Sequence, residues 1–481
     1  MPHTRTRLKT VRRPGHADGS VLEAALDAVR RELELPDGFD ADVLAEAERS
    51  ARSPQASDHD WTDIDFVTVD PPGATDLDQA MHLERRGSGY RVRYAIADVP
   101  AFVTAGGLVD AEARRRGQTL YAPDSRVPLH PPVLSEDAAS LLSDVVRPAF
   151  VWVMDLDDDG ETVAVDVVRA AVRSRAQLDY SGLQADVDAG RPPAPLALLE
   201  EIGRKRIELE HARAGASLAI PDQEVVETPA GYELRFRPPV PAEDWNAQIS
   251  LLTGMAAADL MLAGEVGILR TMPGPDPRTI ARFHRQADAL GAHWQAETPY
   301  GDFLRSLDPT QPKQLALLHA SATLFRGAGY TPFDGAVPER VLQAAVGAPY
   351  AHVTAPLRRL VDRFALVVCE SLCRGREIPD WVRTALPELP ALMGDSDRRA
   401  GALERASLDA AEAIVLADRV GQQFEAVVVD VADDGDSALV QLLDPAVLAK
   451  ADGRLQLGAA VTVVLDAVDP EKRTARFVPA S

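Results

Sequence analysis

The order of strand-rich and helix-rich stretches is the feature that most constrains the fold of this chain. Two helical patterns near the N-terminus are followed from Asp65 by β-rich segments, and the stretch from Asp244 to about residue 418 is mainly helical. From Gly421 the chain returns to short alternating strands, as in a small OB-fold-like β-barrel. We therefore predict an α+β fold, with a mixed β-sheet or barrel surrounded by helices and a second, smaller barrel at the C-terminus.

These changes of pattern divide the 481 residues into three parts. Residues 1–59 hold a basic arm and a short helical linker segment, residues 60–418 the central body, and residues 419–481 the C-terminal barrel. An apolar content of 46% is ample for packed cores in a chain of this length.

The sequence carries no signal for a membrane or for an oxidising compartment. No stretch approaches the ~18 apolar residues of a membrane span, and the N-terminus MPHTRTRLKTVRR lacks the apolar stretch of a secretory signal. Cys369 and Cys373 lie four apart in a helical pattern, which makes a disulfide between them unlikely on geometric grounds. We expect a cytoplasmic protein with no membrane partner.

The charge balance limits the kinds of partner that the chain can bind. A formal net charge of −23 argues against a general nucleic-acid binder, because phosphate contacts need clustered Lys or Arg. An enzyme that draws one strand into a channel needs positive charge only along that channel. The basic arm, with Arg5, Arg7, Lys9, Arg12 and Arg13, either touches phosphates or forms a solvated tail.

An acidic loop follows the first predicted strand. In VDPPGATDLDQA, Asp70 ends a strand and the segment from Pro71 to Thr75 forms a turn, while Asp76 and Asp78 share a face of extended backbone. Converging carboxylates repel one another unless a cation lies between them, and Mg²⁺ or Mn²⁺ suits oxygen ligands. Such a site promotes phosphodiester hydrolysis. A solvated loop or a structural calcium site is the alternative.

A second motif, HVTAPLRRLVDR at residues 352–363, combines a proline turn with two arginines. The pattern predicts a helix with Arg358 and Arg359 in its first turn, where the guanidinium groups and the helix dipole bind phosphate together. The alternative is a surface arginine pair that is neutralised by Asp362.

Taken together, these two motifs resemble the catalytic RNB domain of the ribonuclease II/R family. Between them lie further stretches similar to that family, YAIADVPAFV at 94–103, LVDAEARRRGQTLY at 108–121 and VPLHPPVLSEDAASLL at 127–142. The resemblance covers roughly residues 60–420. It implies the RNB fold and the order of the site residues along the chain.

The resemblance assigns roles to individual positions. It implies that Asp70, Asp76 and Asp78 bind metal and act in catalysis, with Asp78 the most critical. It implies that Arg358 orients the scissile phosphate beside Arg359. Tyr121 matches a tyrosine that stacks on the terminal nucleotides and sets the final product length, and Glu404 matches a further acidic residue near the terminal bases.

One position in the acidic loop departs from the family pattern. Where the family usually has a fourth aspartate, this chain has Gln79, whose carbonyl ligates a cation without adding negative charge. The consequence is either an enzyme with weakened or manganese-tuned metal binding, or an RNA-binding relative that has lost catalysis. Restoring aspartate at this position is expected to tighten the metal site.

The two ends of the chain also differ from the usual family members. The first sixty residues do not resemble the cold-shock modules that precede the catalytic domain in those members, so we expect a short form of the family. In the C-terminal barrel, Phe424 is the only aromatic residue before Phe477. RNA binding by this barrel and a purely structural cap are therefore both open.

The resemblance as a whole implies a 3′-to-5′ exoribonuclease. It implies hydrolysis of single-stranded RNA to nucleoside 5′-monophosphates by metal-activated water, with Mg²⁺ as the cofactor and Mn²⁺ as a possible substitute. We expect a monomer. The alternatives are an RNA-binding regulator of the same fold and a DNA nuclease or general phosphodiesterase, which shares the metal loop but needs no Tyr121.

Overall fold

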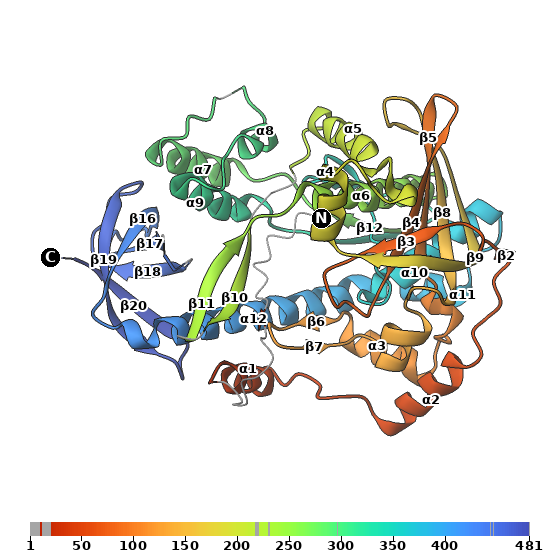
Figure 1. Cartoon of the computed structure of the whole chain (residues 1–481), viewed down its shortest axis with the longest axis horizontal. Helices are drawn as coiled ribbons and strands as arrows, with labels where there is room; N and C mark the ends of the chain where they lie inside the picture. Colours follow the sequence, from red (N-terminus) through yellow and green to blue (C-terminus); the bar gives the residue numbers. More distant parts are fainter. Residues whose placement is uncertain are drawn as a thin grey trace.

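The computed structural model describes residues 10–11, 21–216, 221–228, 231–295, 297–442, 444–445 and 447–480. The arginines and the lysine of the predicted basic arm lie outside these residues. Figure 1 shows a sheet-containing body at one end of the molecule and a small barrel at the other, with the long helix α12 (Leu389–Leu416) running between them. The predicted α+β class and the C-terminal barrel are confirmed.

A mixed six-stranded sheet forms the centre of the body, in the order β2-β9-β3-β4-β5-β8. Strands β2 and β3 run parallel to β9, whereas the β3–β4, β4–β5, β5–β8 and β8–β9 pairs are antiparallel. Because β8 also pairs with β9, the sheet curls back on itself. Its strands are β2 (His59–Asp60), β3 (Phe66–Val69), β4 (Gln79–Arg86), β5 (Gly89–Ala97), β8 (Val146–Leu156) and β9 (Thr162–Leu178).

Alternation along β5 explains why both faces of this sheet are covered. Tyr90, Val92, Tyr94 and Ile96 point to one face and pack with α6 (Pro241–Ala263) and α10 (Leu360–Arg374). Ala95 and Ala97 point to the other face, which packs with α2 (Ala41–Ala51), α3 (Leu108–Arg116) and the π-helical turn η2 (Val133–Ala138). The sheet is thus packed between two apolar layers, and this packing fixes the loops at the ends of its strands.

The stretch from Asp244 to about residue 418 is mainly helical, as predicted, and also contains short strands that the sequence pattern did not reveal. Its strands are β12 (Val266–Thr271), β13 (Gly329–Asp334), β14 (Leu342–Gln343) and β15 (Ala348–Pro349). β12 pairs with β13 and β14 with β15, and Gln343 of β14 also bridges Met272. Their short apolar runs cannot be told from buried helix by periodicity alone.

The remaining elements surround this body. The helices are α1 (Val21–Glu32), α4 (Tyr180–Asp188), α5 (Leu199–Ala212), α7 (Pro277–Ala289), α8 (Tyr300–Arg305), α9 (Pro312–Ser321) and α11 (Asp380–Ala385). Short ribbons are formed by β6 (Leu120–Tyr121) with β7 (Arg126–Val127) and by β10 (Asp222–Thr228) with β11 (Gly231–Arg237), which β1 (Thr10–Val11) joins. No helix in the described part of the chain is both long and apolar enough to span a bilayer. Cys369 and Cys373 have free thiols.

The C-terminal barrel closes in the order β16-β17-β18-β20-β19. Its strands are β16 (Gln423–Val431), β17 (Ser437–Leu442), β18 (Leu448–Asp452), β19 (Ala460–Asp469) and β20 (Thr474–Pro479). Phe424 and Phe477 are both buried and meet edge to face, 5.9 Å apart between ring centroids. Neither ring is therefore available to stack on a base, which favours a structural role for the barrel.

Glu412 connects the long helix to the barrel and to the β10–β11 ribbon. Its carboxylate accepts hydrogen bonds from the Gln223 side chain and from the backbone N–H of Leu448. Burial, with a smaller contribution from Asp409, raises the pKa of Glu412 to about 8. The junction therefore holds a carboxyl group that prefers its protonated form.

We predict that Glu412→Gln removes a pH dependence of stability. Between about pH 4.5 and pH 8 the folded chain keeps a proton on Glu412 that the unfolded chain releases, so the free energy of unfolding falls as pH rises. Glu412→Gln should be more stable than the parent by about 1–3 kcal/mol above pH 8 and similar to it near pH 4. Urea unfolding across this range is the measurement, with the exposed Glu425→Gln as control. A parallel pH profile for the two chains would contradict the prediction.

Candidate active site

Three segments that are distant in sequence converge beside the end of β3. The first is the loop from Asp70 to Asp78, which leaves β3 and enters β4. The second is the turn before α10 that carries Arg358, and the third is the β6–β7 ribbon with Tyr121. The backbone N–H of Thr119 donates to the Arg358 carbonyl at 3.0 Å, which ties the ribbon to the turn.

Asp78 is the most enclosed carboxylate of the loop, with a residue exposure of 3%. Its Oδ1 accepts the backbone N–H of Leu357 at 2.8 Å, and its Oδ2 lies 3.4 Å from Nε of Arg358. Burial raises the pKa of Asp78 well above its usual range, although Arg358 and the Leu357 N–H oppose this. The acidic loop and the arginine turn, predicted separately, are thus brought together.

Asp70 has an oxygen that lacks a partner. Its backbone N–H donates to the Leu178 carbonyl, but its Oδ2 is buried and makes no hydrogen bond. Burial raises the pKa of this carboxyl to about 7, against the opposing effect of Arg358. A buried acceptor without a donor fits a cation, which supplies the missing positive charge and favours the ionised carboxylate.

Asp76 has both carboxylate oxygens occupied. Oδ1 accepts a hydrogen bond from Nη1 of Arg126, and Oδ2 accepts the phenol O–H of Tyr121 at 3.2 Å. Arg126 also donates from Nη2 to Oγ1 of Thr75 at 2.6 Å and pairs with Glu136 at 2.9 Å. The ring of Tyr121 stays accessible, because the residue is 47% exposed.

Gln79 uses its side chain as a tether. Its Nε2 donates to the backbone carbonyl of Thr354, four residues before Arg358, so the amide links the acidic loop to the arginine turn. Within the described residues, no group of three Asp, Glu, His or Cys side chains forms a ready-made metal cage. Mg²⁺ often uses only one or two carboxylates and completes its shell with water and substrate phosphate. Asp70 and Asp78 fit this pattern.

The prediction that Arg358 and Arg359 lie in the first turn of a helix is wrong. Helix α10 begins at Leu360, and Arg359 precedes it in extended backbone, bridged to Gln118. The Arg359 guanidinium is buried and forms a bidentate ion pair with Asp362, at 3.0 and 2.9 Å. Its side chain is thus committed to Asp362, whereas Arg358 remains 32% exposed beside Asp78.

Glu404 lies on α12, on the helix that supports the Tyr121 ribbon. The neighbouring Leu403 packs with Leu120 and Val127 of the two ribbon strands. Glu404 itself is half-buried on this helix.

Two residues of the site were missed by the sequence reasoning. The hydroxyl of Ser140 donates to the Thr75 carbonyl at 2.7 Å and accepts the Leu77 N–H at 2.9 Å, so it fixes the loop between Asp76 and Asp78. Arg126 neutralises Asp76, as described above. The signal for Ser140 was present in the stretch at residues 127–142, which had been used only as a sign of resemblance.

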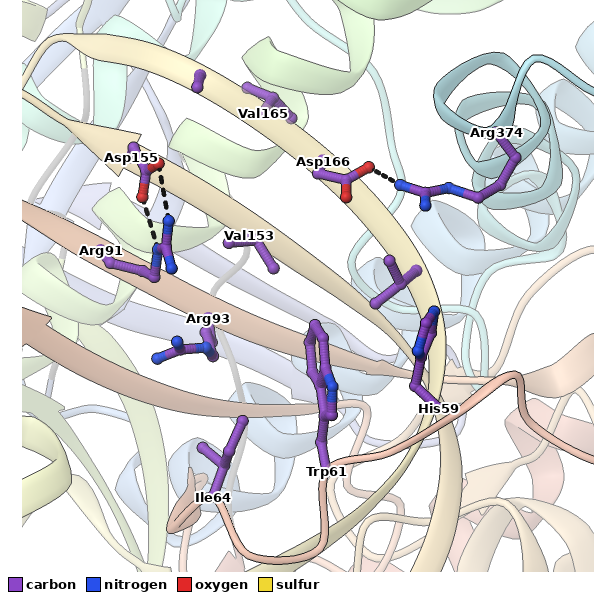
Figure 2. Close-up of a pocket in the computed structure, with 12 residues that line it drawn as sticks. His59, Trp61, Ile64, Arg91, Arg93, Val153, Asp155, Val165, Asp166 and Arg374 are labelled. Carbon is purple, nitrogen blue, oxygen red and sulfur yellow. Dashed lines mark hydrogen bonds and ion pairs between the residues drawn. The ribbon is translucent and has the colours of Figure 1, made fainter.

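A pocket of about 530 Å³ lies elsewhere, against the sheet. Figure 2 shows Trp61 and His59 at one end of it and two ion pairs, Arg91 with Asp155 and Arg374 with Asp166. The acidic loop, Tyr121 and Arg358 do not line this pocket. Since its charges are already paired, it adds nothing to the candidate site.

Comparisons with known proteins identify the family of the chain. The profile of the RNB domain matches residues 58–372, and that of the RNase II-type exonuclease C-terminal S1 domain matches residues 422–480. Ribonuclease R of Aquifex aeolicus is 25% identical over 89% of this chain, and human exosome complex exonuclease RRP44 is 26% identical over 66% of it. The chain spans 64% of the first of these relatives and 35% of the second.

Solved structures share the fold at low sequence identity. Mycoplasma genitalium RNase R in complex with ribose methylated single-stranded RNA superposes with a TM-score of 0.85 at 16% identity, covering 96% of this chain and 79% of the other. Yeast Ssd1, described as a pseudonuclease, gives 0.70 at 15% identity, covering 92% and 58%. The fold is therefore shared by a protein described as an RNase R and by one described as a pseudonuclease.

We predict that Gln79→Asp destabilises the folded chain when divalent ions are absent. We also predict that the variant is stabilised more strongly by divalent ions than the parent. The Thr354 carbonyl loses its donor and faces a carboxylate, which should lower the free energy of unfolding by about 1–3 kcal/mol. Mg²⁺ should recover part of this loss, because the added carboxylate tightens ion binding. Thermal unfolding with and without Mg²⁺ measures both effects.

Gln177→Asp is the matched control for this experiment. Gln177, on β9, donates from its amide to the Ala74 carbonyl of the same loop at 2.8 Å, in an exposed contact. This variant should lose stability while keeping the Mg²⁺ response of the parent. An Mg²⁺ affinity of Gln79→Asp that equals or falls below that of the parent would rule out a ligand role for position 79.

Proposed function

This chain belongs to the RNB-domain family, and on that premise we propose that it is a metal-dependent exoribonuclease. In this proposal it hydrolyses single-stranded RNA from the 3′ end and releases nucleoside 5′-monophosphates. The observation that carries the proposal is the meeting of Asp78 and Arg358 at a buried site, beside the unpartnered oxygen of Asp70. Phosphate and metal chemistry need these groups together.

Nucleases of the RNB family depend on metal ions in general, and we assign the ion here to Mg²⁺, with Mn²⁺ as a substitute. Asp70 and Asp78 are the residues that would hold it. When bound, the ion activates water and stabilises the charge that develops on the phosphate oxygens. Burial of both carboxylates keeps bulk water from screening these charges.

The residues of the chain itself supply orientation. Arg358 is held at its Nε side by Asp78, and its partly exposed guanidinium can clamp the scissile phosphate. Tyr121 presents its exposed ring to the terminal nucleotides, where stacking contributes about 1–3 kcal/mol per base. Glu404 serves the terminal bases from α12. Preference for RNA over DNA rests on contacts to the 2′-hydroxyl.

Two other functions remain as alternatives. An RNA-binding protein without nuclease activity has support in the fold shared with yeast Ssd1 and in Gln79. A DNA nuclease or general phosphodiesterase uses the same carboxylates but has no need of Tyr121. The joint presence of Asp70, Asp78 and Arg358 in one site favours the exoribonuclease. We also propose that the chain acts as a cytoplasmic monomer.

We predict that the purified chain releases nucleoside 5′-monophosphates from uniformly labelled single-stranded RNA with Mg²⁺ or Mn²⁺, and that it cleaves the matching DNA far more slowly. Asp78→Asn should lower this rate by roughly 100-fold or more, because a buried charge essential to the transition state is lost. Asp65→Asn, which changes an exposed carboxylate near the loop, is the control. If no monophosphates appear with either ion and Asp78→Asn binds RNA like the parent, the chain is a binding protein.

A separate prediction concerns Tyr121. Tyr121→Ala should retain cleavage but leave a final oligonucleotide of different length, because the terminal bases lose their stacking platform. Tyr121→Phe keeps the ring and loses only the bond to Asp76, so it should leave the parent's product. Denaturing gels of the reaction end point give the comparison, and an unchanged length in Tyr121→Ala would exclude the stacking role.

A further inference from the structure

The three carboxylates of the acidic loop differ in what neutralises them. Asp78 has the Leu357 N–H and Arg358, and Asp76 has Arg126 and the Tyr121 hydroxyl. Asp70 alone has a buried oxygen without a hydrogen-bond donor. If each carboxylate needed a metal ion, all three would show such a deficit. The need for a cation is concentrated at Asp70.

Arg126 is held in place by contacts on several sides. It is the cross-strand partner of Tyr121 in the β6–β7 ribbon, so both side chains reach Asp76 from one small element. Its guanidinium bonds Asp76, Thr75 and Glu136 together, with the side chain 26% exposed. An ion that took Asp76 as a ligand would have to share its oxygens with Arg126 and Tyr121, beside a guanidinium charge that repels it. The oxygens of Asp78 also have partners, but Arg358 lies 3.4 Å from that carboxylate, whereas Arg126 bonds Asp76 closely and is anchored by Thr75 and Glu136.

We propose that the Arg126 guanidinium supplies the positive charge that neutralises Asp76. Asp76 is then a positioning residue, and the divalent ion is held by Asp70 and Asp78 without it. This inference rests on the proposed function for the ion and for Tyr121. Asp76 clamps the Tyr121 ribbon onto the acidic loop. The four carboxylates of this network (Asp70, Asp76, Asp78 and Glu136) and its two guanidinium groups (Arg126 and Arg358) leave a net charge of −2, which matches one divalent ion.

The same charge balance accounts for Gln79. A second divalent ion would need further negative charge, which a fourth carboxylate in the loop would provide. In this chain that position carries a neutral amide that donates to the Thr354 carbonyl. Arg126 and Gln79 therefore act in the same direction, since both reduce the negative charge available to metal ions.

A charge-balanced double variant tests the proposal. Asp76→Asn combined with Arg126→Met removes one negative and one positive charge that are paired in the parent. Mn²⁺ binding is measured by calorimetry and by electron paramagnetic resonance, without RNA. We expect one Mn²⁺ per chain in the parent, and an affinity in the double variant within about threefold of it, the effect of losing a partly exposed ion pair.

Asp70→Asn is the reference for the loss of a true ligand. It should lower Mn²⁺ affinity by roughly 10- to 100-fold or more. A loss of that size in the double variant would show that Asp76 is a ligand and overturn the proposal, as would two bound ions in the parent. Arg91→Met, which removes a guanidinium 24% exposed and paired with Asp155, controls for loss of an arginine ion pair.

The positioning role has its own readout. In the double variant the ribbon is no longer clamped, so the final oligonucleotide should change in length, as in Tyr121→Ala. The single variant Arg126→Lys keeps Asp76 and the positive charge, so the length of its final oligonucleotide should at least partly match that of the parent. An unchanged length in the double variant would contradict the clamp. If RNA is not cleaved while one Mn²⁺ still binds at Asp70 and Asp78, the proposed function fails and the charge assignment stands.

Discussion

The ion pair between Asp78 and Arg358 is the interaction on which the arrangement of the site depends. It joins the loop after β3 to the turn before α10, and the Leu357 N–H bonds the same carboxylate. Because Asp78 is buried, removing Arg358 leaves a charge without compensation in a poorly solvated place, which is far more costly than losing a surface pair. The two segments are therefore held together by the same groups that are assigned to the chemistry.

Much of the fold was predictable because it is local. The strands on either side of the acidic loop follow from alternation, and the closed C-terminal barrel follows from short strands at regular spacing. The start of α10 was not predictable, because the bridge between Arg359 and Gln118 keeps that residue extended where the local pattern favours helix. The pairing of β12 with β13 likewise depends on residues far apart in sequence.

In the candidate site, too, residues that lie in sequence motifs were predicted, whereas residues that depend on contacts in the folded chain were not. Asp70, Asp78 and Arg358 were found because their motif spacing is visible in one dimension, and the structure brings them together. Arg126 was missed because its importance comes from its contact with Asp76, a residue 50 positions earlier in the chain. The different fates of Arg358 and Arg359 were equally hidden, since only the folded turn shows that Asp362 takes the second arginine and leaves the first beside Asp78.

The long helix α12 bears on how such a protein can evolve by exchange of modules. Its Leu403 packs under the ribbon, while Ala411, Val415 and Leu416 belong to the apolar core of the barrel. A recombination point at residue 419, the predicted start of the barrel, would separate the barrel from the last turns of the helix that packs in its core. The segment that can be exchanged as one structural unit therefore begins upstream of the barrel, within α12. A lineage that replaced its C-terminal barrel would have to replace that part of the helix as well.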